Sequence, residues 1–421
     1  MINKQKVLLF ISITFVIASF IFFLIPYLVT KTSIGWSYGE ETGVIGDTIG
    51  GIVGPTVGFV GAILTFLAFY IQYQANQVQI RALNEQKIST KEQKKQMLLQ
   101  QFESNFFVMI NLHRQNVSEL NYTKFDNGSS KTGVHRKVFR TIFREFIECF
   151  REVKGFSNSK NPNDYLIPVY RSELSEIIND NNIKNDSNNI EINLIELAII
   201  DIAYSIVFYG INKESEPILR QRFKKRYNPS YFFPLLQYIK LKPKQENTHR
   251  WDIWLELRKY KGKELRTIIQ EFYEYKRVTR KNRPFTPLSA KTRFLDYDEE
   301  FNKYYGGHLH RLGHYFRHLF QCYKYLNYHR DLSENEKYFY GKTLRAQLSN
   351  YEQAILFVNS ISTLGMKWEL TPEVEFLSES EVKSKSKLIT RFNLIKNLPD
   401  YHLSGLKYKK YYPNVKYEAD E

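Results

Sequence analysis

Two long runs without a charged residue near the start of the chain constrain its fold more than any other feature. The first run covers residues 7–29, and the second covers residues 48–80, with its apolar part at residues 49–71. About 20 apolar residues in a helix cross the hydrocarbon core of a bilayer. The first run is too long for the apolar region of a signal peptide, and no small-residue cleavage site follows it. We therefore expect two membrane-spanning helices.

The basic residues beside these runs predict their orientation. Lys4 and Lys6 precede the first run, and a series of Lys and Arg residues between Arg81 and Lys95 follows the second, whereas the loop between the runs contains only Lys31. Cytoplasmic flanks of membrane helices carry the excess of Lys and Arg. We expect a two-pass protein of the lipid bilayer whose N- and C-termini both lie in the cytoplasm.

The second run carries small residues at a four-residue spacing, which places them on one face of a helix. These residues are Gly50, Gly54, Gly58 and Ala62. Small residues let two membrane helices approach each other closely. This face fits either self-association into a homo-oligomer or packing against the first run, and the sequence leaves both open.

The remaining sequence predicts a helical cytoplasmic part. Residues 72–120 contain neither Pro nor Gly, so we expect one long helix there. Apolar residues at helical spacing predict helices over residues 135–153 and 190–211, with a polar loop at 121–133 and a polar surface insertion at 157–189. The expected fold is mostly α, with two transmembrane helices followed by a long helix and an all-α cytoplasmic domain. The expected parts are a two-helix membrane anchor (1–75), a long connecting helix (76–120), a helical cytoplasmic domain (121–366) and a C-terminal extension (367–421).

The chain of 421 residues has a net charge of +16, which favours an anionic partner such as lipid headgroups or RNA. Two basic clusters in the predicted cytoplasmic domain are interleaved with aromatic residues, as in surfaces that hold single-stranded nucleic acid. The residues that we expect to contact nucleic acid or lipid are Arg222, Lys224, Lys225, Arg226, Arg280 and Lys281. A solvated helix face is the more common explanation of such clusters.

Residues 304–365 form the most distinctive block of the chain. Its apolar spacing predicts two antiparallel helices separated by a short break. Ser333 and Glu336 at the start of the second helix have the spacing of a capping box.

Three histidines of this block, His310, His314 and His318, share one face of the first predicted helix. Zinc sites need further ligands, and no cysteine or carboxylate at ligand spacing joins these histidines. Cys149 and Cys322 are the only cysteines, and they form neither a metal-site pattern nor a disulfide framework. We therefore expect no metal and no cofactor.

Two interpretations of the block remain open. Arg311 and His318 fit the arginine–six residues–histidine pattern of HEPN-type ribonucleases, in which the pair acts on the RNA phosphate and the ribose 2′-hydroxyl. Alternatively, the histidines and arginines of the first helix form a buried polar network with the second helix, because buried polar groups need partners. The expected partners are Arg345, Gln347 and Glu352.

Four short strings give the chain a resemblance to phage abortive infection proteins of the AbiC type. The strings are Gly46 to Gly51 with Pro55, Phe106–Phe107 with His113, Gly313 to His318, and Leu344 to Ser349. The last two contain four polar residues that we carry over as family signatures, namely His314, Arg317, Arg345 and Gln347. The resemblance covers most of the chain up to about Lys367.

The resemblance implies a bacterial inner-membrane protein that defends against phage, in which the infected cell stops growing or dies before progeny are released. It brings no established catalytic residue, so whether the protein is an enzyme stays open. One hypothesis is a membrane-anchored effector whose cytoplasmic domain senses a phage product or a defence partner protein and which acts by oligomerisation at or in the inner membrane. The alternative is a membrane-tethered HEPN-like ribonuclease that uses Arg311 and His318.

Overall fold

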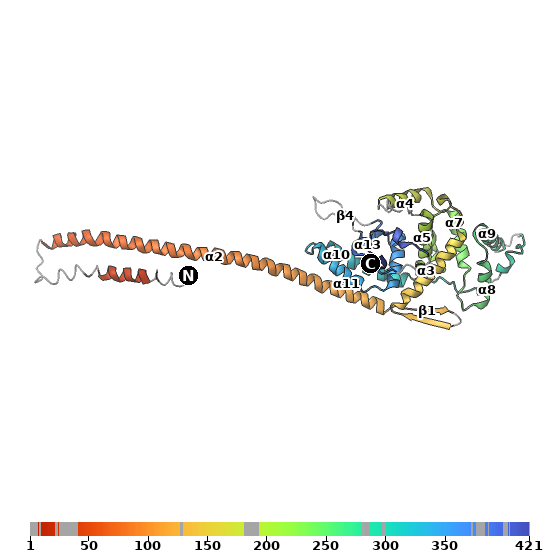
Figure 1. The fold of residues 1–421 in the computed structure, drawn as a ribbon, viewed down its shortest axis with the longest axis horizontal. Coiled ribbons are helices and arrows are strands. Elements are labelled where there is room, and N and C mark those ends of the chain that lie inside the picture. The colour runs from red at the N-terminus through yellow and green to blue at the C-terminus, as the bar shows by residue number, and fades with distance from the viewer. Residues whose placement is uncertain are drawn as a thin grey trace. The chain divides into compact units, whose positions relative to one another are not determined.

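The computed structural model describes residues 7, 10–21, 24, 41–126, 129–180, 193–279, 281, 286–296, 300–371, 374–375, 384–385, 387–398, 403 and 405–420. The described residues are mostly helical, as predicted (Figure 1). The chain divides into two compact units, residues 1–98 and residues 99–421.

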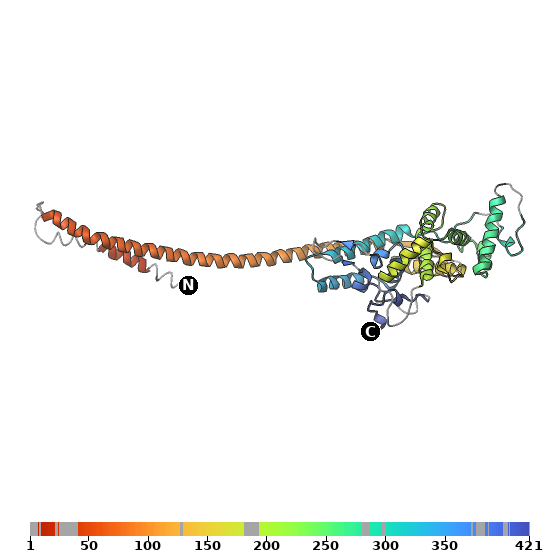
Figure 2. The ribbon, with the colours of Figure 1, turned by 90° about the horizontal axis from the view of Figure 1, so that it is seen from above.

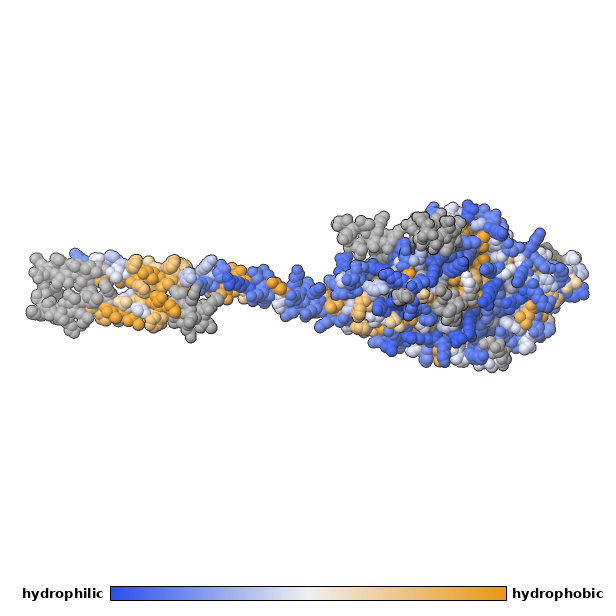
Figure 3. Space-filling view, viewed as in Figure 1, coloured by the Kyte–Doolittle hydropathy of each residue, from blue (hydrophilic) through white to orange (hydrophobic). Residues whose placement is uncertain are grey.

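The first unit contains an apolar helix, Phe10–Ile21, and the first part of α2, the helix Glu41–Ser118. In both ribbon views the shorter helix runs beside the beginning of α2 (Figure 1, Figure 2). Hydrophobic residues cover much of the visible surface of this unit, as Figure 3 shows. By length and composition, Val53–Ser118 could cross a membrane. Residues 8–9, 22–23 and 25–29 of the first apolar run lie outside the described part, so the two complete spans stay a prediction.

The small-residue face of α2 is open in this unit. Gly50, Gly54 and Gly58 are exposed, and a Cβ atom added to any of them would meet no atom of the described residues within 4 Å. In contrast, Val60 and Ile63 are partly buried, and the rotation of about 100° per helical residue places them on the opposite face. The described residues of the first unit therefore leave the small-residue face free.

The long helix predicted over residues 72–120 is confirmed, and it joins the second apolar run without interruption. In the second unit, Phe102 and Phe106 of α2 are fully buried and their rings lie 5.0 and 5.4 Å from that of Tyr340. The polar loop predicted at residues 121–133 is wrong. It is an antiparallel hairpin of β1 (Asn121–Asp126) and β2 (Ser129–Val134).

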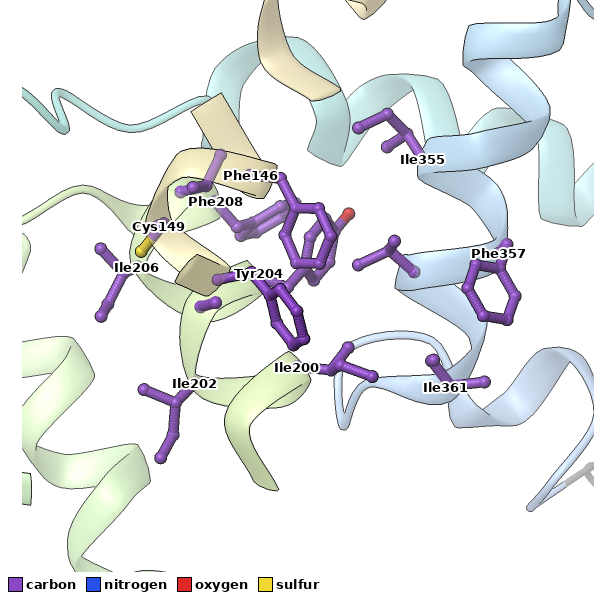
Figure 4. Packing of buried hydrophobic residues seen from close by; sticks show 14 of the residues in the cluster. Phe146, Cys149, Ile200, Ile202, Tyr204, Ile206, Phe208, Ile355, Phe357 and Ile361 are labelled. Carbon is purple, nitrogen blue, oxygen red and sulfur yellow. The ribbon is translucent and has the colours of Figure 1, made fainter. Parts of the chain in front are cut away.

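The core of the second unit is built around α3 (Lys137–Phe156), which packs against α5 (Leu194–Tyr209) and α12 (Asn350–Ile361). Their facing side chains gather in one cluster, shown in Figure 4. The helix predicted over residues 135–153 is confirmed as α3, whose apolar residues recur at helical spacing and are buried. The buried helix predicted over residues 190–211 is confirmed as α5, which is apolar on every face.

The predicted surface insertion at residues 157–189 is partly wrong. Its described residues form the short 3₁₀ helix Pro162–Asp164 and α4 (Pro168–Asp180). Tyr165 and Leu174 are buried because their apolar side chains join the core. The helices that follow are α6 (Glu216–Lys224), α7 (Pro229–Lys240), α8 (Thr248–Leu257) and α9 (Gly262–Thr279), and a 3₁₀ helix at Arg293–Leu295.

The distinctive block contains three helices rather than two. They are α10 (Leu309–Tyr328), α11 (Glu334–Arg345) and α12. The capping box at Ser333 and Glu336 is confirmed, and a second box at Ser349 and Glu352 starts α12. The continuous helix expected after Ser333 is therefore wrong, because the second box begins a new helix.

The C-terminal segment is part of the second unit. It contains β3 (Val374–Glu375), β4 (Ser384–Lys385), α13 (Leu388–Phe392) and 3₁₀ helices at Met366–Trp368, Tyr408–Lys410 and Glu418–Asp420. Ile395 and Tyr412 are buried in the common core. Gly341 of α11 lies so close to Phe392 that an added Cβ atom would lie 2.2 Å from the ring.

Candidate functional site

The most site-like feature of the second unit is a cavity of about 640 Å³ where α2 ends and α3 begins. The β1–β2 hairpin creates this junction, because the pairing of Asn121 with Val134 returns the chain to the end of α2. There the backbone N–H of His135 donates to the Leu120 carbonyl (2.8 Å), and His135 Nδ1 lies 2.5 Å from the Ser118 carbonyl oxygen. The lining residues are His113, Arg114, Gln115, Val117, Ser118, Val134, His135, Arg136, Lys137 and Gln347.

His113 is the lining residue with unsatisfied polar atoms. Its side chain is buried, with 1% exposed, and neither ring nitrogen has a hydrogen-bond partner among the described residues. Its ring lies 5.1 Å from that of Tyr315 and 6.0 Å from that of His318, both on α10. Burial, and then the charges of His318 and Arg136, lower the pKa of His113 to about 4. The imidazole is therefore neutral at pH 7, with one nitrogen that donates and one that accepts.

Three cationic side chains line the same cavity as this imidazole, and all three are exposed: Arg114, Arg136 and Lys137. The Arg136 guanidinium donates to the Gln347 carbonyl (2.8 Å) and lies 3.8 Å from a Glu352 carboxylate oxygen. Within the described ranges, no carboxylate lies within 4 Å of Arg114 or Lys137. The cavity thus combines unneutralised positive charge with a neutral histidine, which suits an anionic ligand.

The two residues of the predicted ribonuclease pair both contact backbone carbonyls. Arg311 Nε donates to the Asn121 carbonyl (2.9 Å), and its guanidinium lies 4.7 Å from the centre of the Tyr122 ring. His318 Nε2 lies 2.9 Å from the Met109 carbonyl oxygen. These contacts join α10 to β1 and α2 within one chain. A catalytic role needs a second copy that completes a cleft, so it stays a prediction.

The other signature residues are spread over the surface and the core. His314 and Arg317 are exposed, and Arg317 Nε donates to the Gly313 carbonyl of its own helix (3.0 Å). Arg345 is buried and donates to the carbonyls of Phe392 (2.9 Å) and Asn393 (3.2 Å). Arg345 therefore fixes the C-terminal segment to α11.

The polar contacts between α10 and its partner helices involve other residues than those expected from the sequence. Glu352 accepts a hydrogen bond from the Tyr315 hydroxyl (3.0 Å), and Gln347 contributes its backbone carbonyl to Arg136. His310 and His314 are exposed. In the part of the chain that the structure describes, no three His, Cys, Asp or Glu side chains group as metal ligands.

Sequence reasoning missed a buried charge network on α3. Glu145, Glu148 and Glu152 lie at spacings of three and four residues, so they share one face. The buried Lys242 ammonium donates to Glu152 (2.7 Å) and Glu148 (3.0 Å), and His308 Nε2 lies 2.8 Å from Glu145. Tyr122, Tyr304 and Tyr305 donate their hydroxyls to the same three carboxylates. The only sequence signal was three glutamates beside the apolar stripe of α3.

The pKa values in this network follow from the pairing. Burial alone would raise the pKa of Glu145, but the hydrogen bond and charge of His308, followed by the charge of Lys124, hold it below its usual value. Burial would lower the pKa of Lys242, but the carboxylates of Glu152 and Glu148 raise it. The pairing therefore favours the charged forms of Glu145 and Lys242 at neutral pH. Because its hydrogen bonds join α3 to β1 and to residues 242 and 304–308, it stabilises the second unit.

Among the described residues, the aromatic side chains of the first basic cluster offer no open stacking surface, whereas Tyr273 and Tyr275 beside the second cluster are partly exposed. Phe223, Tyr227 and Phe232 of the first cluster are buried in the core. Arg222 and Arg226 lie over the rings of Tyr209 and Tyr170, at 5.3 and 5.7 Å from the ring centres. Lys224, Lys225 and Lys281 are exposed, and Arg280 lies outside the described residues. Contact of these residues with nucleic acid or lipid stays a prediction.

A comparison with family models gives one match, and it falls on the distinctive block. Residues 307–379 match the model described as putative phage abortive infection protein. The matched segment contains α10, α11 and α12, and thus Tyr315, His318 and Gln347, which lie against His113 or line the cavity. No curated protein and no solved structure matches the chain. The resemblance drawn from the sequence is confirmed over this segment: residues 307–379 carry the pattern of the putative phage abortive infection protein family.

Proposed function

We propose that the protein is a membrane-anchored abortive-infection effector that senses phage infection through its cytoplasmic domain and acts by oligomerisation at or in the inner membrane. One observation carries the proposal: α2 is a single helix that contains an apolar segment long enough for a membrane at one end and the cavity residue His113 at the other. The cavity in turn contacts the segment that matches the phage-defence family.

The proposed topology places both termini in the cytoplasm, and it rests on the basic residues that flank the two apolar runs. Cys149 and Cys322 are buried, so they give little background in a labelling experiment. We expect a membrane-impermeant maleimide to label Ser37→Cys in cells with a permeabilised outer membrane. Lys160→Cys should be labelled only after the inner membrane is opened. The reverse pattern would contradict the topology.

Oligomerisation is proposed because two spans per chain cannot enclose a useful pore, and because no described residue covers the small-residue face of α2. The substitutions Gly54→Leu and Gly58→Leu place large side chains on this face and should prevent close contact between helices. The matched control is Ile63→Leu on the opposite face. We expect Gly54→Leu with Gly58→Leu to abolish crosslinked oligomers and phage protection at equal membrane levels, and the control to keep both. Full protection by the double variant would contradict this mechanism.

The ribonuclease alternative rests on Arg311 and His318, which lie on one helix at a catalytic spacing. Its readout is RNA integrity in infected cells, because a ribonuclease would cleave RNA during infection. RNA fragments in cells with the wild-type chain, but not in cells with His318→Asn or Arg311→Lys, would favour the ribonuclease alternative. Intact RNA during full protection would exclude it.

A further inference from the structure

The sequence did not predict the cavity at the end of α2. The residues that line it favour the binding of a ligand. We infer that it binds a small phosphate-bearing ligand, with Arg114 and Lys137 as the charge partners and His113 as a hydrogen-bond partner. The role of this ligand as the trigger of the defence response rests on the proposed function. The binding of the ligand to the cavity does not rest on it.

The charges that line the cavity favour an anionic ligand. Arg114 and Lys137 come from different helices, α2 and α3, and both line the same cavity. Neither has a carboxylate within 4 Å in the described part of the chain, so no described residue neutralises their charges. A phosphate group accepts charge-assisted hydrogen bonds from both kinds of side chain. Arg136, which is shared with Glu352, adds a third cation at the cavity.

The unsatisfied imidazole of His113 also favours a ligand. Buried polar atoms almost always have a partner, yet both ring nitrogens of His113 lack one among the described residues. The ring is held in place by Tyr315 and His318 rather than by hydrogen bonds. A ligand oxygen that enters the cavity would accept from its N–H, and a ligand hydroxyl could donate to its other nitrogen.

The beginning of α3 adds to the positive potential. This helix has 20 residues, no acidic residue in its first turn and no side-chain cap at Arg136. The N-terminal end of a helix carries partial positive charge and favours anions. The end of α2 has the opposite effect, but His135 Nδ1 already contacts the Ser118 carbonyl there.

The size and composition of the cavity favour a small ligand over a nucleic-acid strand. Its volume of about 640 Å³ lies in the range of about 300–1,000 Å³ that is typical of small-molecule sites. Surfaces that hold single strands stack bases on aromatic rings. The described lining contains no Phe, Tyr or Trp. Gln347 also lines the cavity, and the amide N–H of Gln115 donates to the Glu119 carboxylate (3.0 Å).

The test uses the full chain in a neutral detergent and titration calorimetry with three probes: ADP, inorganic phosphate and adenosine. We expect ADP to bind, phosphate to compete with it, and adenosine not to bind, because the phosphate supplies most of the affinity. Affinity for ADP should fall as salt increases. If adenosine binds as tightly as ADP, or if ADP shows no heat at millimolar concentration, the inference is overturned.

Variants locate the binding. Arg114→Gln and Lys137→Gln are exposed changes that leave the core intact, and each should weaken ADP binding by about tenfold or more, which corresponds to about 1.4 kcal/mol. His113→Phe keeps an aromatic ring against Tyr315 and should also weaken binding. The matched control is the pair Lys224→Gln and Lys225→Gln, with the same charge change elsewhere, which should leave binding unchanged. Equal loss in control and cavity variants would overturn the inference.

Phage challenge separates this inference from the proposed function. If the cavity variants lose ADP binding and also lose protection at equal membrane levels, the ligand is the trigger. If they lose binding but protect fully, the site stands and the trigger role is overturned. If the wild-type chain gives no protection although it binds ADP, the proposed function fails while the site remains.

Discussion

The buried charge network allows a sharp prediction about Lys242. Only 2% of the Lys242 side chain is exposed. Its ammonium donates to Glu152 (2.7 Å), Glu148 (3.0 Å) and the Tyr305 hydroxyl (3.2 Å). Lys242→Met keeps an unbranched side chain of similar length but removes the charge. Because the carboxylate of Glu152 is then buried without its cation, we expect a loss of about 3–5 kcal/mol in the free energy of unfolding.

The assay is denaturant unfolding of the full chain in detergent, followed by tryptophan fluorescence. Trp254 is buried and its ring lies 5.9 Å from the Lys242 nitrogen, so it reports on this region. Lys259→Met is the matched control, because Lys259 forms an exposed ion pair with Glu256. Exposed pairs contribute at most about 1 kcal/mol.

A second substitution tests the cause of the loss. Glu152→Gln removes the buried carboxylate that Lys242→Met leaves unpaired, and it keeps an oxygen that can accept from Tyr305. The double variant should therefore be more stable than Lys242→Met alone, because neutral buried groups avoid the cost of an unpaired charge. A loss for Lys242→Met no larger than that of the Lys259→Met control, or purely additive losses, would refute the network as described.

Three further predictions concern other described contacts. The pKa of His113 is 6.5 in the unfolded chain and about 4 in the folded protein. As the pH is lowered, the unfolded state therefore binds a proton before the folded state does. The free energy of unfolding should fall by about 2 kcal/mol when the pH is lowered from 7 to 5. Unfolding measured over that range should show a smaller decrease in His113→Phe, in which Arg136 and His318 remain, and an unchanged slope would contradict the assignment. Gly341→Ala should cost about 1–3 kcal/mol by forcing its methyl group against Phe392, and a thermal midpoint equal to wild type would contradict the packing. Ser349→Ala removes the cap of α12 and should cost about 1–2 kcal/mol in chemical unfolding.

The sequence predicted the helices of this chain better than their boundaries and partners. Residues 72–120 contain neither Pro nor Gly, and the structure indeed has no break there. The break before α12 was missed, although Ser349 and Glu352 repeat the capping-box spacing that was recognised at Ser333. The hairpin after α2 was missed because its residues are polar rather than alternately apolar. Residues 127–128, Asn-Gly, nevertheless carry a turn signal.

The candidate site was less accessible to sequence reasoning. His113 was noticed only as part of a resemblance, and Arg114 and Lys137 resemble many other basic residues of the chain. Their convergence depends on the hairpin, which brings the start of α3 to the end of α2. Such a junction between segments has no periodic pattern. In contrast, Arg311 and His318 had a pattern, but the structure places both against backbone carbonyls.

Membrane potential reports directly on whether the proposed effector acts on the inner membrane of the infected cell. A voltage-sensitive dye should be followed in single cells during phage infection, with the wild-type chain and with Gly54→Leu plus Gly58→Leu. We expect cells with the wild-type chain to lose their membrane potential before phage lysis, and cells with the double variant to hold it until lysis. If cells with the wild-type chain restrict phage but hold their potential until lysis, the proposed action at the membrane is wrong.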